Sequence, residues 1–126
     1  MKKENKEREL QIHIGDTLDD MGRRFVDAWH RAERRELTPE NAERHVGFET
    51  FETLSRIMTP RRLELLRHVH RNPARSIRAL AIALDRDYRR VHEDVAALIE
   101  AGLLDRDESG LHANYETVRI ETRVAL

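Results

Sequence analysis

Apolar residues recur every three or four positions through the second half of the chain, a spacing that predicts amphipathic helices. Thr59-Pro60 is a helix start signal, because a threonine cap is followed by proline at the first helical position. Ser76 is a second cap, and Gly102 stands where a left-handed C-terminal cap belongs. We therefore predict helices from Pro60 to about Asn72, from Ile77 to Leu84, and from the end of the Asp85-Arg86-Asp87 connection to Gly102. The positions expected to be buried are Leu63, Leu66, Val69, Ile77, Leu80, Ala81, Leu84, Val91, Val95, Leu98 and Ile99.

Alternating apolar and polar residues predict short strands elsewhere. Residues 10–14 and 118–124 alternate in this way, and Val46 with Phe48 fits a further short strand. Residues 103–106 and 111–113 flank Asp107-Glu-Ser-Gly110, a turn sequence that predicts a β-hairpin.

The first half carries one long amphipathic segment and two further start signals. Residues 1–8 form a polar tail that we expect to be disordered, and Asp16 or Thr17 can cap the segment that follows. Thr38-Pro39-Glu40 repeats a start signal, and Thr50 precedes a helix expected to bury Phe51, Leu54, Ile57 and Met58. The apolar stripe of the long segment consists of Leu18, Met21, Phe25, Ala28, Trp29 and Ala32.

The order helix, helix, short turn, helix, hairpin is the plan of a winged helix-turn-helix. We therefore predict a mainly α fold with a small β component, in which an N-terminal strand-helix extension precedes the winged helix-turn-helix. Residues 48–126 form the predicted DNA-binding domain. Residues 1–47 form a predicted dimerisation region, because they hold more apolar surface than a tail requires.

Composition excludes several classes of protein. Of the 126 residues, 39% are hydrophobic and 37% are charged, which suits a compact domain with an ionic surface. No apolar run approaches the ~20 residues that a membrane-spanning helix needs, and we expect no secretory signal because no apolar stretch follows the charged residues 1–10. The chain has no cysteine, which excludes thiolate metal sites and suits a reducing compartment. We expect a cytoplasmic protein that does not bind membranes.

The net charge of −1 conceals an uneven distribution. The segment 56–92 has ten arginines, no lysine and three acidic residues, so it carries +7 while the rest of the chain carries −8. A basic segment inside an acidic remainder indicates a surface for a polyanion, although solvated helix faces would give the same pattern. Arginine suits bidentate contacts with phosphate and guanine better than lysine does.

The helix after residue 87 is the predicted recognition helix of the major groove. With its apolar stripe inward, Tyr88, Arg89, His92 and Glu93 lie toward the outer face and Arg90 lies at its side. Arg89 and Arg90 are the foremost candidates for DNA contact, since arginine pairs with guanine O6 and N7. Tyr88 either faces the groove or packs under the hairpin.

Other residues are expected to contact the phosphate backbone or to support the helices. Arg75, Ser76 and Arg78 lie at the start of the bracing helix, Arg86 lies in the turn, and Arg106 and His112 belong to the hairpin. Such contacts release counterions and make binding depend steeply on salt. Asp85 and Asp87 are expected to set the turn or cap the helix. A solvated face is the expected location of Arg61, Arg62, Arg67 and Arg71.

Nothing in the sequence indicates catalysis. The seven histidines are scattered without a metal-ligand spacing, and the five glycines form no phosphate-binding loop. We predict no catalytic residue, no metal site and no cofactor, and we expect the protein not to be an enzyme.

Several motifs resemble a known family, the prokaryotic MarR-like winged helix-turn-helix predicted transcriptional regulators, which include the TumA-type antitoxins. The resemblance covers roughly residues 48–120. The motifs that carry it are Phe48-Glu-Thr-Phe-Glu-Thr-Leu54, Met58-Thr-Pro-Arg-Arg-Leu-Glu-Leu-Leu66, Ser76-Ile-Arg-Ala-Leu-Ala81, Leu84-Asp-Arg-Asp-Tyr88, Val91-His-Glu-Asp-Val95 and Ala101-Gly-Leu-Leu104.

The resemblance implies a winged-helix DNA-binding protein and an antitoxin that binds a small toxin and represses its own operon. The family favours asparagine where this chain has Arg90 and a basic residue where it has Glu93. These departures concern base preference, not the fold.

The sequence therefore predicts a sequence-specific regulator of transcription, a repressor that binds double-stranded DNA as a homodimer. The alternative is a protein-interaction module that neutralises a cognate toxin, with DNA binding incidental. The second hypothesis predicts that binding to the partner protein survives the loss of Arg89 and Arg90, and this distinguishes it from the first.

Overall fold

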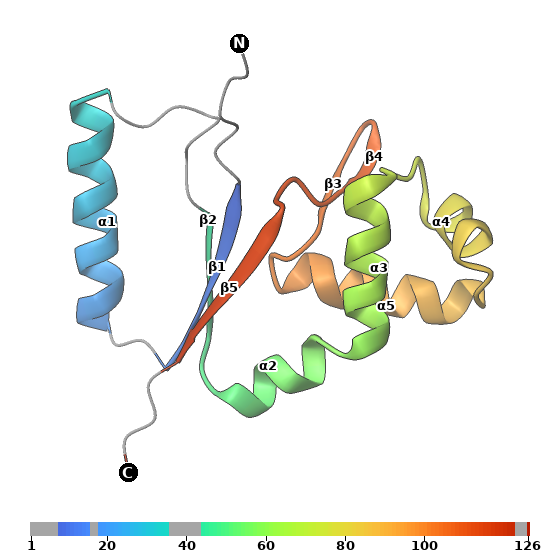
Figure 1. The fold of residues 1–126 in the computed structure, drawn as a ribbon, viewed down its shortest axis with the longest axis horizontal. Coiled ribbons are helices and arrows are strands. Elements are labelled where there is room, and N and C mark those ends of the chain that lie inside the picture. The colour runs from blue at the N-terminus through green and yellow to red at the C-terminus, as the bar shows by residue number, and fades with distance from the viewer. Residues whose placement is uncertain (1–7, 16–17, 36–43, 123–125) are drawn as a thin grey trace. The chain divides into compact units, whose positions relative to one another are not determined.

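A computed structural model describes residues 8–15, 18–35, 44–122 and 126 of the chain. Within these residues it contains five helices and five strands (Figure 1). The fold is mixed α/β, so the prediction of a mainly α fold with a small β component understated the role of the strands. The predicted tail up to residue 7, the cap at Asp16 or Thr17, the start at Thr38-Pro39-Glu40 and the end of the last strand lie outside the described residues.

The chain forms two compact units. The first combines residues 1–51 with residues 115–126, and the second consists of residues 52–114. The sequence predicted a single boundary between residues 47 and 48, whereas the structure assigns residues 115–126 to the first unit. The C-terminal strand, assigned by sequence to the DNA-binding domain, pairs instead with the N-terminal strand.

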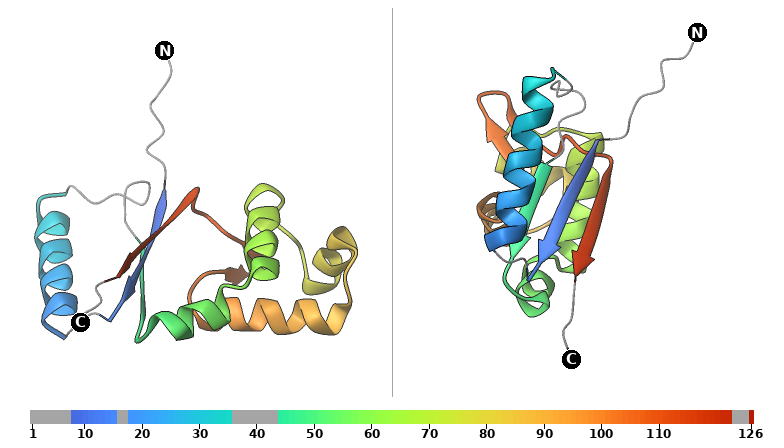
Figure 2. Two further views of the ribbon diagram at one scale, coloured as in Figure 1. Left: turned by 60° about the horizontal axis from the view of Figure 1, so that its bottom comes forward. Right: turned by 90° about the vertical axis from the view of Figure 1, so that its left-hand side faces the viewer.

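A three-stranded parallel sheet forms the centre of the first unit. It consists of β1 (Glu9–Ile14), β2 (Arg44–Phe48) and β5 (Thr117–Thr122), in the order β2-β1-β5. Ile12 of β1 is in register with Val46 of β2 and Ile120 of β5. The three arrows point the same way in the right-hand view of Figure 2. The strands were predicted from their alternation, whereas their parallel pairing was not.

The central strand is fully buried on one face and partly buried on the other. Leu10, Ile12 and Ile14 lie on one face and are at most 5% exposed. His13 points to the other face and is also buried, with its Nε2 2.7 Å from Nδ1 of His45 in the neighbouring strand. A buried polar ring needs such a hydrogen-bond partner. Gly15 ends the strand with φ +72°, as its position after the alternating run predicted.

The helix between β1 and β2 is α1 (Leu18–Glu33), and its extent agrees with the predicted amphipathic segment. Its apolar stripe is not buried within the chain. Met21, Phe25 and Trp29 are 46%, 69% and 59% exposed, respectively.

The second unit contains the predicted series of helices and the hairpin. After α2 (Phe51–Ile57) come α3 (Pro60–Arg71), α4 (Ile77–Leu84) and α5 (Tyr88–Glu100), then β3 (Asp105–Asp107) and β4 (Gly110–His112). Leu66, Val69, Leu80, Val91, Val95 and Leu98 are buried, as their spacing predicted. Phe51 was predicted to be buried and is 56% exposed, and Leu54 is the buried residue of the short helix α2.

None of the helices described by the structure has the length and apolar character needed to span a membrane.

Candidate nucleic-acid interface

A short connection joins α4 to α5, and local hydrogen bonds define both helices at their ends. The Ser76 hydroxyl caps α4 by accepting from the Ala79 amide at 3.1 Å. The Asp87 carboxylate caps α5 by accepting from the Arg90 amide at 3.2 Å. Both residues have the short polar side chain that N-caps favour, and Ser76 also has an extended backbone, with φ −156° and ψ 165°. The predicted roles of Ser76 and Asp87 as caps are confirmed.

The chain reverses direction at Asp85, which adopts a left-handed conformation with φ 52° and ψ 50°. The amides of Asp85 and Arg86 donate to the carbonyls of Ile82 and Ala81 at 3.1 and 3.0 Å, so the last turn of α4 keeps its hydrogen bonds. Aspartate tolerates this conformation better than most residues. Asp85 and Asp87 therefore serve the turn, as predicted.

The β3-β4 hairpin is attached to the segment that leads into α4. Leu111 and Ala74 exchange two backbone hydrogen bonds, of 2.7 and 3.3 Å. The approach is so close at Gly110 that an added Cβ would lie 2.0 Å from the Ala74 carbonyl oxygen. The bridge places the hairpin beside the start of α4, where Arg75 and Ser76 follow directly in the chain.

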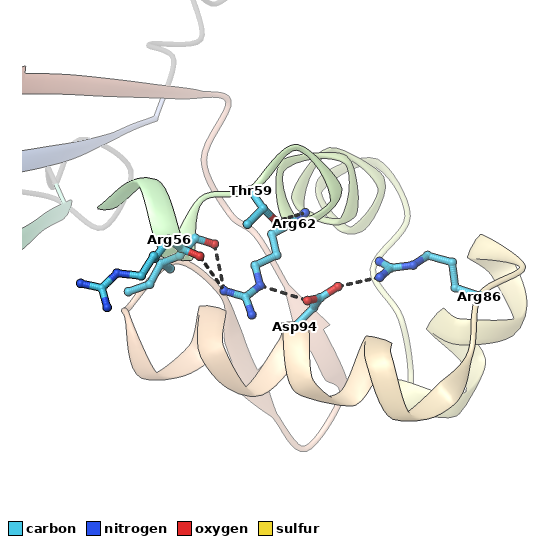
Figure 3. A network of polar contacts seen from close by, with 6 residues as sticks. Arg56, Thr59, Arg62, Arg86 and Asp94 are labelled. Atoms are coloured by element: carbon cyan, nitrogen blue, oxygen red, sulfur yellow. Dashed lines mark hydrogen bonds and ion pairs between the residues drawn. The ribbon is translucent and has the colours of Figure 1, made fainter. Parts of the chain in front are cut away.

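Asp94 of α5 is the centre of a polar network that joins α3, α5 and the turn (Figure 3). Its Oδ1 accepts from Nε of Arg62 at 3.0 Å, and its Oδ2 accepts from Nη2 of Arg86 at 2.8 Å. Nη1 of the Arg62 guanidinium donates to the backbone carbonyls of Arg56 and Ile57 at the end of α2. The side chains of Arg62, Arg86 and Asp94 are only 14–19% exposed. Each charge in the network is thus paired, as partly buried charges must be.

This network corrects part of the prediction from sequence. Arg62 was expected on a solvated face, yet it holds the beginning of α3 against α5 and the end of α2. Arg86 was predicted to bind DNA, and the structure gives its guanidinium a role in fixing the turn. Its contribution to DNA binding stays a prediction.

The remaining eight arginines of the basic segment are exposed. Arg89 and Arg90 lie in the first turn of α5, and within the described part of the chain no hydrogen bond or ion pair engages either guanidinium. Tyr88 is 49% exposed and packs on His92, one turn further along the helix, with ring centroids 5.9 Å apart. Of the two alternatives for Tyr88, the structure therefore favours the exposed one. Arg75 and Arg78 are exposed at the start of α4.

A shallow concavity of about 850 Å³ lies beside the first turn of α5. Arg61, Arg89 and Arg90 line it as exposed cations, next to the paired Arg62 and Arg86. Asp85, Asp87, Glu93 and Asp94 also line it, so the surface is mixed in charge and not uniformly basic. Alternating donors and acceptors suit a ligand that itself presents both, such as the edges of base pairs beside phosphates.

The hairpin presents a second group of polar side chains. Arg106 is exposed on β3, and His112 on β4 is half-buried. Oδ1 of Asp107 accepts from both the hydroxyl and the amide of Ser109, and His112 Nε2 lies 3.1 Å from the same oxygen. The hydrogen bonds from Ser109, together with the charge of His112, lower the pKa of Asp107. These contacts hold the hairpin turn in one shape.

Sequence reasoning missed Asp94 because its partners lie 8 and 32 residues away. One signal was available in the sequence. Asp94 stands three residues after Val91 and four before Leu98, so it lies at the edge of the apolar stripe of α5.

Replacing Asp94 with asparagine is expected to lower the free energy of unfolding by about 2 kcal/mol, because two partly buried guanidinium groups lose their counter-charge. Thermal unfolding followed by circular dichroism should show a midpoint about 5–10 °C lower. The control is Glu93→Gln, which removes the same charge from the exposed neighbouring position and should change the midpoint by less than about 2 °C. Equal midpoints for the two variants would contradict a stabilising network.

Among the described residues, no group of three or more histidine, aspartate or glutamate side chains is placed to hold a metal ion.

A family model named HVO_A0114 matches residues 57–120, just over half of the chain. The chain therefore belongs to the HVO_A0114 family. The matched residues include all of α3, α4, α5 and the hairpin, that is, the elements of the candidate interface. Comparison with the curated proteins and with the solved structures finds no match.

Proposed function

We propose that residues 52–114 form a winged helix-turn-helix that binds double-stranded DNA, and that the protein is a dimeric repressor of the MarR-like kind. In this proposal α5 is the recognition helix, α4 is the bracing helix and the β3-β4 hairpin is the wing. The observation that carries the proposal is the pair of free guanidinium groups, Arg89 and Arg90, in the first turn of a helix that follows α4 after a three-residue connection.

The internal contacts support this assignment. A recognition helix must be held firmly while its outer face stays free. The caps at Ser76 and Asp87 fix the ends of the two helices, and Asp94 ties α5 to α3 and to the turn. The contacts of α5 come from its first turn and from the partly buried Asp94, whereas the side chain of Arg89 stays exposed.

The distribution of exposed charge provides further support. Arg75 and Arg78 at the start of α4 and Arg106 on the hairpin are exposed cations on either side of the Ala74–Leu111 bridge. They are suited to contact the phosphate backbone, and Arg89 and Arg90 are suited to read base edges. Regulators of this type read one half-site per copy, which is the reason for proposing a homodimer.

Fluorescence anisotropy with the full chain tests the proposal. Labelled duplexes from the DNA upstream of the gene are compared with scrambled duplexes over a series of salt concentrations. We expect a preference of about 10³-fold or more for the upstream duplex, and affinity that falls steeply with salt. Equal affinity for both duplexes, with a shared salt slope, would mean only nonspecific attraction to phosphate and would contradict a sequence-specific regulator.

A further inference from the structure

Most side chains of α1 are exposed, and the few that are half-buried are charged and not apolar. Asp20, Arg24 and Arg31 are half-buried, whereas the stripe of Met21, Phe25 and Trp29 faces outward. A surface helix normally buries its apolar stripe and exposes its charges. Three large apolar side chains in a row on one helix form the kind of exposed patch that marks an interaction surface.

The apolar stripe of α1 is symmetric about Phe25. Met21 precedes Phe25 by four residues and Trp29 follows it by four, while Gly22 precedes it by three and Ala28 follows it by three. When two copies of such a helix pair in antiparallel orientation about Phe25, Met21 of each copy lies level with Trp29 of the other. The small residues Gly22 and Ala28 are then also level, which lets the helices approach closely.

The charges of α1 favour the same orientation. Asp19 and Asp20 stand at the beginning of the helix, and His30 and Arg31 stand in its last turn. Antiparallel pairing brings the acidic beginning of each helix to the basic end of the other, and it opposes the two helix dipoles. Parallel pairing would place like charges side by side.

From these observations we propose that α1 is a self-recognition surface, on which α1 of a second copy of this chain packs in antiparallel orientation about a two-fold axis at Phe25. An isologous dimer requires a surface that complements itself. The helix α1 meets this requirement in the spacing of its large and small side chains about Phe25 and in the opposite charges of its two ends. An unrelated partner would not require this symmetry. The proposal identifies the interface of the dimer that the proposed function calls for, and to that extent rests on it.

The mass of the protein in solution, without DNA, tests whether the stripe is the interface. The full chain should have twice the chain mass of 14.9 kDa by light scattering over a concentration series. Phe25→Glu should reduce the mass to that of one chain. The matched control is Ile82→Glu, which places the same charge at an aliphatic side chain that is 75% exposed on α4, and this variant should stay dimeric. Far-ultraviolet circular dichroism verifies that both variants are folded.

Disulfide cross-linking tests the orientation, since the chain contains no cysteine of its own. Gly22→Cys is suitable because an added Cβ meets no atom within 4 Å. A mixture of Gly22→Cys with Ala28→Cys should form a cross-linked dimer under oxidising conditions. Either variant alone should not, because its two cysteines would be offset by six residues, about 9 Å along the helices, beyond the ~7 Å that a disulfide can span.

Each contrary outcome has a definite meaning. Cross-linking of Gly22→Cys with itself would show parallel helices and would overturn the proposed orientation. A monomeric wild-type chain, or a dimeric Phe25→Glu variant, would overturn the proposal that the stripe of α1 is a self-recognition surface. Since no DNA is present in these measurements, such results would leave DNA binding to be decided by anisotropy alone.

Discussion

Replacing both Arg89 and Arg90 with alanine is expected to weaken binding to the upstream duplex by about 10²- to 10³-fold. Each bidentate contact between arginine and guanine contributes about 1–3 kcal/mol of discrimination, and 1.4 kcal/mol corresponds to a factor of ten. Both side chains are exposed and have no partner within the described part of the chain, so their removal should leave the fold intact. Anisotropy at one fixed salt concentration measures the loss, and an unchanged thermal midpoint verifies that the variant is folded.

The control for this variant is Arg67→Ala with Arg71→Ala, which removes the same two charges from exposed positions on α3. If only net charge mattered, both double variants would lose affinity equally. We expect the control to retain its preference for the upstream duplex, with a loss of less than about threefold. The salt dependence separates two kinds of contact, because each lost phosphate contact reduces the slope by about 0.9 whereas lost base contacts leave it unchanged. Equal losses in the two variants would contradict a specific role for α5.

The substitution Gly110→Ala is expected to have the largest effect on stability, roughly 3–5 kcal/mol. Gly110 has φ +124°, a conformation that residues with a Cβ rarely adopt, and its added methyl group would overlap the Ala74 carbonyl. A backbone atom cannot move aside as a flexible side chain does. The hairpin would therefore have to detach from the Ala74 segment, with loss of both hydrogen bonds to Leu111. Thermal unfolding should show a midpoint more than about 10 °C lower.

The control for this substitution is Gly47→Ala in β2, where an added Cβ meets no atom within 4 Å and φ is not positive. Its thermal midpoint should stay within about 3 °C of the wild type. Hydrogen exchange of the Leu111 and Ala74 amides provides a local measurement, and both amides should lose protection in Gly110→Ala. Protected amides and an unchanged midpoint would contradict the close approach of hairpin and bracing segment.

Features that depend on neighbouring residues in the chain could be predicted from the sequence. Thr59, Ser76 and Asp87 cap their helices in the structure, since a cap involves an amide only three residues away. The buried stripe of α5 follows from a spacing of three or four residues. Gly110 was predicted only as a turn residue. The reason why no side chain fits there is the close approach of the Ala74 backbone, which is far away in the sequence.

The partners of the strands could not be predicted in the same way. Alternation identifies a strand and its two faces, but it does not identify the neighbouring strand. β1 and β5 are about a hundred residues apart in sequence and still pair along six residues. The contact between His13 and His45 follows from the pairing of β1 with β2, so the sequence alone did not indicate why a histidine is buried there.

The sequence by itself determined the helices, their caps, the hairpin and the basic segment that includes Arg89 and Arg90, because these depend on local backbone preference and on spacing. Only the tertiary structure decided that three distant strands form one parallel sheet. It also decided that Arg62 and Arg86 form ion pairs with Asp94 and so do not belong to the exposed basic surface. The tertiary structure also decided that the stripe of α1 faces outward. These features depend on which distant segments meet, and that outcome is set by the packing of the whole chain.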